Sequence, residues 1–216
     1  MPSTADDLAL AGRALARHGL VDAFGHVSAR SDDGTWSITP PVPLARAVPG
    51  SVQLLDLAGP DLGPGLPREA WIHREIAAAR PDVGAVCRAQ PLTATALASA
   101  GVPIRPLHGQ GAFLGPQVAV HDDPRLVRDR AAAARLAATL GAGSAVVMRG
   151  NGAVTVGADL GQAVARMWVL ERSALMNATA ASGTATPLDD DEQDAWCAVA
   201  PELLQRIWLY LKEEES

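Results

Sequence analysis

The stretch PDVGAVCRAQP, residues 81–91, joins a short apolar segment to a polar end. Val83 to Cys87 has the length and composition of a buried strand, with turn-forming residues on either side. Arg88 and Gln90 follow directly, at alternate positions. Residues at the ends of strands are well placed to bind ligands, because a rigid element holds them at the edge of the core. We therefore expect this strand to bring an arginine and a glutamine to a functional site.

The segments around this strand predict a mixture of helices and strands. Apolar residues recur at helical spacing, or form short runs bounded by glycine and proline. Helices are expected at 5–18, 68–80, 91–100, 124–140, 159–181 and 191–212, further strands at 35–39, 51–57, 144–148 and 153–156, and an extended connection at 102–121. The order is not a strict strand–helix alternation, so we expect an α/β fold with a mixed or antiparallel sheet covered by helices. No linker divides the chain, which predicts a single domain over residues 1–216.

Composition excludes several classes of protein. The net charge is −6 and there is no basic run, which argues against nucleic acid as the main partner. No apolar run approaches the length of about 18 residues that a membrane-spanning helix needs. The acidic N-terminal stretch MPSTADDLAL lacks the layout of a signal peptide, and the two cysteines are far apart in the sequence. We expect a cytoplasmic chain with no membrane partner.

Three polar stretches could carry chemistry, and each also has a structural interpretation. Glu69 and His73 lie four residues apart on an expected helix, either as an acid/base pair or as an exposed pair on a solvated face. The small-residue stretch GHVSAR, residues 25–30, is expected to be a turn that either binds an anion through backbone N–H groups and Arg30, or only connects strands. RGNG, residues 149–152, has the pattern of a hairpin turn. Spacing alone leaves these alternatives open.

Taken in order, these stretches resemble the class II aldolase/adducin family. The resemblance rests on GLVDAFGHVSAR at 19–30, PREAWIHREIAAARPDVGAV at 67–86, GAFLG at 111–115 and the segment from VVMRGNG to LERSA at 146–174. The branch with VDAFGHVS includes decarboxylases of hydroxylated aromatic or muconate-type acids. The resemblance implies a three-layer α/β/α sandwich around a mixed, mostly antiparallel sheet. It also implies a homotetramer with sites at subunit boundaries.

The family's chemistry uses a divalent metal, commonly zinc, which is held by three histidines. The resemblance places these histidines at Arg88, Gln90 and Asn151 of this chain. A guanidinium is cationic and has no lone pair to give, and amide oxygens are weak ligands for zinc. We therefore expect no metal and no other cofactor.

The acid/base glutamate of the family corresponds to Glu69, with His73 close to it. We expect Arg88 to replace the metal as the electrophile, while Gln90 and Asn151 add hydrogen-bond donors. These residues predict a metal-independent lyase that decarboxylates, enolises, dehydrates or cyclises a small conjugated or keto acid, most simply a carboxylate. The expected substrate-binding residues are Gly25, His26, Ser28, Arg30, His108, Gln110 and Tyr210.

The alternative is a non-catalytic binding or assembly module, as in the aldolase-like domain of adducin. Convergence of Glu69, Arg88, Gln90 and Asn151 within a few Å would favour the enzyme. An ion pair between Arg88 and Glu69 that closed the pocket would favour the binding module.

Overall fold

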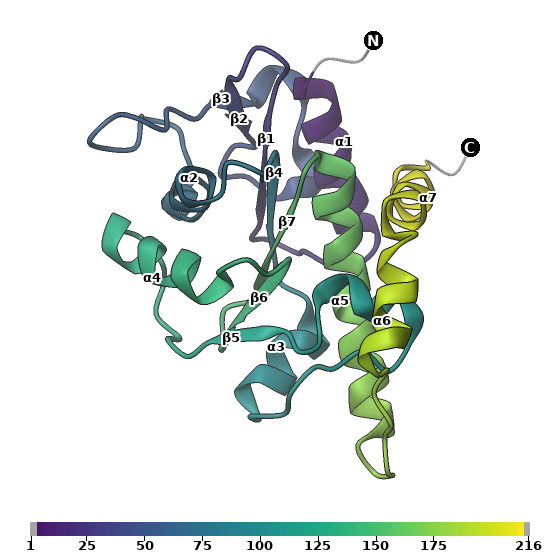
Figure 1. Cartoon of the computed structure of the whole chain (residues 1–216). Coiled ribbons are helices and arrows are strands. Elements are labelled where there is room, and N and C mark those ends of the chain that lie inside the picture. The colour runs from purple at the N-terminus through teal and green to yellow at the C-terminus, as the bar shows by residue number, and fades with distance from the viewer. Residues whose placement is uncertain (1–3, 214–216) are drawn as a thin grey trace.

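A seven-stranded sheet forms the middle layer of the computed structural model, which describes residues 4–213 (Figure 1). The strand order is β3-β2-β1-β4-β7-β6-β5, and every neighbouring pair is antiparallel except β5 and β6. The strands are β1 (His26–Arg30), β2 (Trp36–Ile38), β3 (Gln53–Leu54), β4 (Ala85–Ala89), β5 (Ala119–His121), β6 (Ala145–Met148) and β7 (Ala153–Gly157). This arrangement confirms the predicted mixed, mostly antiparallel sheet.

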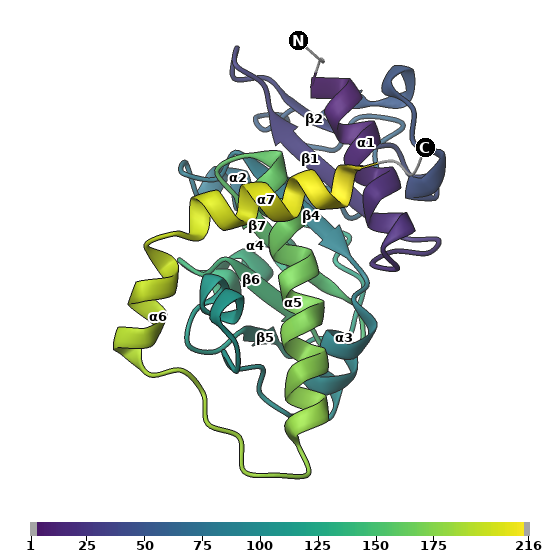
Figure 2. The same cartoon turned by 90° about the vertical axis from the view of Figure 1, so that its right-hand side faces the viewer.

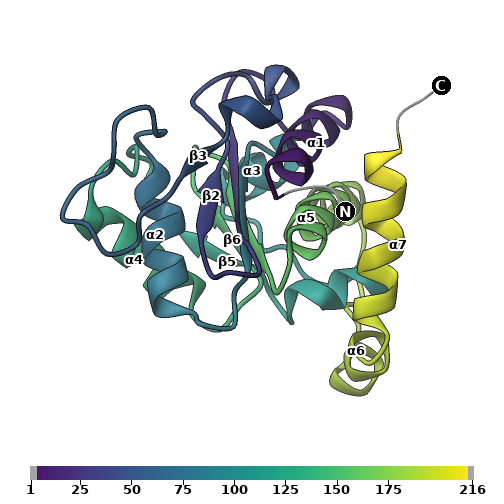
Figure 3. The same cartoon turned by 90° about the horizontal axis from the view of Figure 1, so that it is seen from above.

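Helices cover both faces of the sheet, which gives the three predicted layers (Figure 3). Helices α2 (Ala70–Ala79) and α4 (Arg130–Leu140) pack on one face and on each other. The opposite face is covered by α1 (Thr4–Arg17), α3 (Leu92–Ser99), α5 (Leu160–Ala180) and α7 (Ala200–Lys212). In Figure 2, α7 crosses the N-terminal end of α5, and α6 (Asp190–Cys197) leads into it. Within residues 4–213 no helix has the combination of length and hydrophobicity needed to cross a membrane.

The central strand β4 is buried on both faces, which explains its apolar sequence. Val86 belongs to the core under α2 and α4, whereas Cys87 belongs to the core under α1 and α5. Side chains alternate along a strand, so Arg88 lies on the same face as Val86. Strand β4 therefore directs the side chain of Arg88 towards the layer that contains α2.

GHVSAR is a strand, so its prediction as a turn was wrong. Residues 26–30 form β1, paired with both β2 and β4. Val27 and Ala29 enter one core, and His26 and Ser28 lie between them on the other face. The alternation of polar and apolar residues is the period of a strand, and the small side chains fit a buried central position.

Several boundaries also differ from the prediction. The expected helix 191–212 breaks at residues 198–199, because Pro201 has no N–H to donate to the carbonyl of Cys197 and its ring would clash with that carbonyl in a continuous helix. The expected helix 124–140 begins only at Arg130, where Asp129 caps it by accepting a hydrogen bond from the N–H of Ala132. The connection 102–121 contains the 3₁₀ helix η3 (Gly109–Leu114) and β5. The expected strand 51–57 is reduced to β3, and short 3₁₀ helices occupy Leu44–Arg46 and Pro49–Ser51 before it.

Candidate functional site

Strand β4 places Arg88 in the centre of the sheet, directly opposite His26 on β1 and Val154 on β7. The side chain is 1% exposed. Asn151, in the turn between β6 and β7, lies beside it, and its Oδ1 accepts a hydrogen bond of 2.9 Å from Nη2 of Arg88. Gly152 follows with a φ of +85° and brings the turn within reach of β4. The turn and the strand thus act together to place an amide against the guanidinium.

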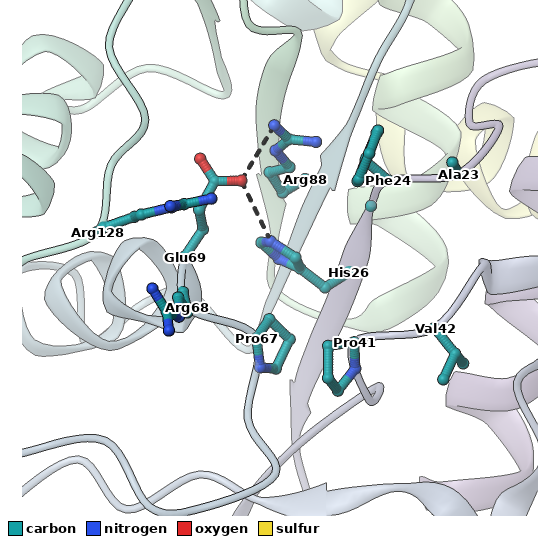
Figure 4. A pocket seen from close by; sticks show the side chains of 11 residues that line it. Ala23, Phe24, His26, Pro41, Val42, Pro67, Arg68, Glu69, Arg88 and Arg128 are labelled. Carbon is teal, nitrogen blue, oxygen red and sulfur yellow. Dashed lines mark ion pairs between the residues drawn. The ribbon is translucent and has the colours of Figure 1, made fainter.

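Glu69 joins this pair from the residue before α2. Its Oε2 lies 3.1 Å from Nη2 of Arg88, and its Oε1 accepts a 3.3 Å hydrogen bond from Nδ2 of Asn151. The backbone N–H of Val127, in the loop before α4, also donates to Oε1 at 3.4 Å. Three elements therefore bring together Glu69, Arg88 and Asn151, which are three of the four residues whose convergence would favour the enzyme (Figure 4 shows Glu69 and Arg88).

Part of the hydrogen-bonding capacity of Arg88 is unused by the described residues. The ion pair of Arg88 with Glu69 and its hydrogen bonds to the side chain and backbone carbonyl of Asn151 all use Nη2. Nε and Nη1 are buried and have no partner among the described residues. A buried donor without an acceptor costs about 1–3 kcal/mol, and more when it is charged. These two N–H groups are therefore the features of the site most in need of an acceptor.

A histidine pair lies behind the carboxylate. Nε2 of His26 is 3.9 Å from Oε2 of Glu69, while Nδ1 of His26 is 2.6 Å from Nε2 of His73. Nδ1 of His73 is in turn 2.6 Å from Oγ of Ser28. Glu69 and His73 were expected to share one helix face, but Glu69 is the residue that precedes α2. The ring of His26 lies between them, because it contacts His73 through Nδ1 and faces Glu69 through Nε2. Their coupling is therefore indirect.

The charges in this cluster are fixed by burial and by Arg88. Burial raises the pKa of Glu69, but His26, the positive charge of Arg88 and the amide of Asn151 lower it more, to about 2. Burial lowers the pKa of His26. Burial also lowers the pKa of His73 well below its usual value, and the neighbouring His26 ring and the positive charge of Arg88 disfavour a charge on His73 further. At neutral pH the site therefore holds a carboxylate, a guanidinium and two neutral imidazoles.

A cavity of about 260 Å³ opens next to these groups (Figure 4). One side is cationic: Arg68 and Arg128 line it together with Arg88. The other side is apolar and is formed by Phe24, Val42, Pro41, Pro67 and Ala23. Sequence reasoning missed this wall and the two outer arginines. Arg68 could have been suspected from its place beside Glu69, but nothing in the sequence around Arg128 separates it from other surface arginines.

The remaining expected site residues divide into those at the cavity and those away from it. Gly25 and His26 line the cavity, and Ser28 lies behind it. Five of the expected residues neither line the cavity nor hydrogen-bond, among the described residues, to the groups that line it: Gln90, Arg30, His108, Gln110 and Tyr210. Gln90 follows the end of β4, and its backbone N–H donates to the carbonyl of Leu20. Their assignment to the site is not supported by the geometry within one chain.

Arg30 lies at the far end of β1, where it lines a different hollow with Asp159. His108 contacts Oγ of Ser173 at 2.9 Å and lines, with Gln110, a pocket beside Trp168. Tyr210 is 54% exposed on α7, with its ring near those of His18 and Trp168. His108, Gln110 and Tyr210 lie on the side of the sheet covered by α5 and α7.

The donor set does not fit a family-type zinc ion. The position closest to the carboxylate is held by Arg88, a buried cation without a lone pair. The side-chain oxygen of Asn151 already accepts a hydrogen bond from that guanidinium, and its side-chain nitrogen donates one to Glu69. Between residues 4 and 213, no three histidine, cysteine, aspartate or glutamate side chains come close enough to hold a metal ion.

Comparison with known proteins agrees with the fold and the motif order. The sequence profile described as "Class II Aldolase and Adducin N-terminal domain" matches residues 6–178. A 3,4-dihydroxyphthalate decarboxylase from Terrabacter sp. (strain DBF63) is 31% identical over 207 residues, covering 88% of this chain and 86% of the relative. One from Arthrobacter keyseri is 30% identical over 204 residues, covering 86% of this chain and 82% of the relative.

The fold also matches solved structures. The crystal structure of L-fuculose-1-phosphate aldolase from Thermus thermophilus superposes with a TM-score of 0.73 at 29% identity, covering 84% of this chain and 97% of the aldolase. The profile match spans most of the chain, and the relatives align over nearly its whole length. The chain therefore belongs to the class II aldolase and adducin N-terminal domain family.

Proposed function

We propose that this chain is a decarboxylase that acts on a small hydroxylated aromatic or conjugated acid and needs no metal ion. The observation that carries the proposal is Arg88, which lines a cavity together with the ionised Glu69. Two nitrogens of its buried guanidinium have no partner among residues 4–213. The family and the decarboxylase relatives support a lyase of this kind. The metal-independent part of the proposal rests on the donor chemistry of Arg88.

The cavity has the two surfaces that such a substrate needs. A carboxylate matches the guanidinium of Arg88, because charge-assisted hydrogen bonds to two N–H groups of arginine are strong and directional. A flat ring fits against the apolar wall, which includes Phe24 and Val42. The volume of about 260 Å³ suits a single ring with small substituents.

Glu69 and Arg88 can divide the chemistry between them. The carboxylate of Glu69 takes the proton of a substrate hydroxyl and returns it to the carbon that bears the carboxyl group. The bond between that carbon and the carboxyl group then breaks, CO₂ leaves, and the electron pair passes into the conjugated ring. The ring oxygen is left as an oxyanion, which Arg88 stabilises and which takes up one proton from solvent after release.

Substrate binding adjusts Glu69 for this role. With a pKa of about 2 the free carboxylate is a weak base. A substrate carboxylate on Arg88 would share that positive charge and would place a second negative charge near Glu69. Both effects raise the pKa of Glu69, so the carboxylate becomes a stronger base when a substrate is present.

The proposal is tested by turnover on a panel of acids. Wild-type protein is incubated with benzoates and phthalates that differ in their hydroxyl groups, among them 3,4-dihydroxyphthalate, and CO₂ and product are measured. We expect turnover with at least one acid and a loss of about 100-fold or more in Glu69→Gln and Arg88→Met. Unchanged turnover in both variants would exclude this site.

One observation favours the binding-module alternative: Arg88 and Glu69 do form an ion pair. The cavity beside the pair remains open, however, so the pair does not fill the pocket. Calorimetry separates the two functions. A binding module would take up the same acids with a dependence on Arg88 but would release no CO₂.

The assembly of the chain is also a proposal. Class II aldolases are commonly oligomeric, and we propose a homotetramer in the cytoplasm in which Tyr210, exposed on α7, approaches the cavity of a neighbouring subunit. Sedimentation of the intact protein, with turnover of Tyr210→Phe, tests this arrangement. A monomer, or a variant with unchanged turnover, would remove Tyr210 from the site.

A further inference from the structure

Three buried polar side chains form a continuous line behind the cavity. Ser28 and His73 are 0% exposed and His26 is 5% exposed. The two contacts between them, Oγ of Ser28 to Nδ1 of His73 and Nε2 of His73 to Nδ1 of His26, each measure 2.6 Å. At the cavity end the line reaches Nε2 of His26, which faces Glu69 at 3.9 Å. His73 is thus held at both of its nitrogens, and His26 is held at Nδ1.

Two arrangements of protons are possible along such a line, and they differ in their cost. In the first, the hydroxyl of Ser28 donates to His73, the Nε2–H of His73 donates to His26, and the Nε2–H of His26 faces the carboxylate of Glu69. In the second, every donor is reversed. The hydroxyl hydrogen of Ser28 then has no acceptor among residues 4–213, and a lone pair of His26 faces a negative charge. An unpaired buried donor costs about 1–3 kcal/mol, so the first arrangement is favoured.

The line cannot work as a supply of protons. It ends at Ser28, whose hydroxyl is buried and contacts only His73 among the described residues. A proton that left His26 and was replaced along the line would leave an alkoxide at Ser28, whose oxygen contacts no positively charged group among residues 4–213. The line therefore fixes orientation and the position of protons instead of delivering them.

We infer that Ser28 and His73 are positioning residues that hold His26 as a neutral imidazole with its Nε2–H directed into the cavity. At 3.9 Å from Glu69 this N–H is too far away for a good hydrogen bond, so it is available to an arriving oxygen atom. In the proposed decarboxylation, on which this last step rests, that atom is the substrate oxygen that becomes negatively charged. His26 then acts with Arg88, its neighbour across β1 and β4.

The proton positions can be measured without any substrate. Protein labelled with ¹⁵N in its histidines is examined by long-range ¹H–¹⁵N NMR at pH 6 to 8. We expect His26 and His73 both as neutral rings protonated at Nε2 over this range. A wild-type spectrum in which His26 carries its proton on Nδ1, or is a cation at pH 7, would overturn the inference.

Ser28→Ala tests the role of the hydroxyl. Without this donor the Nδ1 of His73 has no partner, so a measurable fraction of both rings should change to the Nδ1–H form, and Ser28→Thr should restore the wild-type pattern. The matched control is Ser173→Ala, which removes an equally buried hydroxyl from a different histidine, His108. It should shift the signals of His108 and leave those of His26 unchanged. Unaltered His26 and His73 tautomers in Ser28→Ala would contradict the inference.

Kinetics then separate this inference from the proposed function. With an active substrate, Ser28→Ala should lower kcat about tenfold, leave KM within about twofold, and regain activity in Ser28→Thr. If no acid is turned over, the NMR result still stands, and only the link to the substrate oxygen is lost. If turnover occurs and Ser28→Ala keeps full kcat, the positioning role fails while the decarboxylase survives.

Discussion

Arg88 and Glu69 form a buried ion pair of 3.1 Å that leaves Nε and Nη1 of the arginine without a partner in the described part of the chain. A pair that existed only for stability would be expected to satisfy its remaining donors, because each buried orphan weakens it. Arg88 and Glu69 both line a cavity, and Glu69 is held there in its ionised form. We therefore interpret the pair as part of an anion-binding site.

The first prediction concerns the loss of this anion site. Arg88→Met should abolish detectable binding of a substrate carboxylate, and it should also destabilise the fold because Glu69 is left as an unpaired buried charge. Titration calorimetry with a hydroxylated phthalate measures the binding. Arg74→Met is the matched control: Arg74 is also 1% exposed, but it donates to backbone carbonyls on the far side of α2. Binding lost equally in both variants would point to general damage to the fold.

The second prediction concerns substrates with a second acidic group. Arg68 and Arg128 line the cavity mouth and have no ion pair or hydrogen bond with a residue between 4 and 213. Arg128→Gln should raise KM for a dicarboxylate about fivefold, which corresponds to an exposed ion pair of about 1 kcal/mol, and should change KM for a monocarboxylate little.

Arg125→Gln is the control for this effect, because Arg125 is an exposed arginine of the same loop that pairs with Asp123 and does not line the cavity. Steady-state kinetics at low and high salt provide the measurement. Equal rises in KM for both kinds of acid would show that Arg128 contributes only general charge.

Much of the fold could be predicted from the sequence, because the local signals agree with it. An apolar run bounded by prolines indicated strand β4, and the order of the motifs indicated the layers. The convergence of Glu69, Arg88 and Asn151 was also expected. The turn predicted for GHVSAR was wrong because its glycine and small residues suggested a loop, while the alternation of His26, Val27, Ser28 and Ala29 between two faces is a strand pattern.

The remaining errors come from contacts between residues far apart in sequence. His26 and His73 are 47 positions apart, so no spacing rule could place them 2.6 Å from each other. Gln90 was expected beside Arg88 from strand alternation, but β4 ends at Ala89, and the chain turns at Pro91 before Gln90 can face the cavity. Strand periodicity holds only as far as the strand continues.

The third prediction concerns acid stability. The pKa of Glu69 is about 2 in the folded chain, below its ordinary value of 4.5. The ionised carboxylate therefore stabilises the fold fully above pH 4.5, and this contribution is lost as the pH falls from 4.5 towards 2, because the unfolded chain takes up the proton first. A pKa difference of this size corresponds to about 3 kcal/mol.

Glu69→Gln lacks this titration. The free energy of unfolding of the wild type should exceed that of the variant most above pH 5, and the gap should narrow steadily between pH 4.5 and pH 2. Urea unfolding at a series of pH values measures it. A gap that stays constant over this range would mean that Glu69 has an ordinary pKa in the folded state.

The fourth prediction concerns metal. The resemblance places Arg88, a cation without a lone pair, at a ligand position of the family's zinc site. Protein purified without chelator should therefore contain no stoichiometric zinc, and dialysis against EDTA should leave turnover unchanged. Elemental analysis and a turnover assay after dialysis provide the measurements. About one zinc per chain, or activity restored only by added metal, would show that Arg88 moves aside to admit an ion.

The fifth prediction compares two glycines of one turn. Both have a positive φ, +72° at Gly150 and +85° at Gly152. A Cβ on Gly152 would lie 2.2 Å from the carbonyl oxygen of Ala89, at the end of the strand that carries Arg88, whereas a Cβ on Gly150 would meet only Pro124, at 3.8 Å. Gly150→Ala should therefore cost about 1–2 kcal/mol from backbone strain alone.

Gly152→Ala should cost clearly more than Gly150→Ala in the free energy of unfolding, because the turn must move away from β4. That movement separates Asn151 from Arg88, so turnover should also fall, whereas Gly150→Ala should keep it. Urea unfolding and the decarboxylation assay on both variants measure the two effects. Equal losses of stability would show that the turn has room to shift, and that the close approach of Gly152 to Ala89 is not what holds Asn151 against the guanidinium.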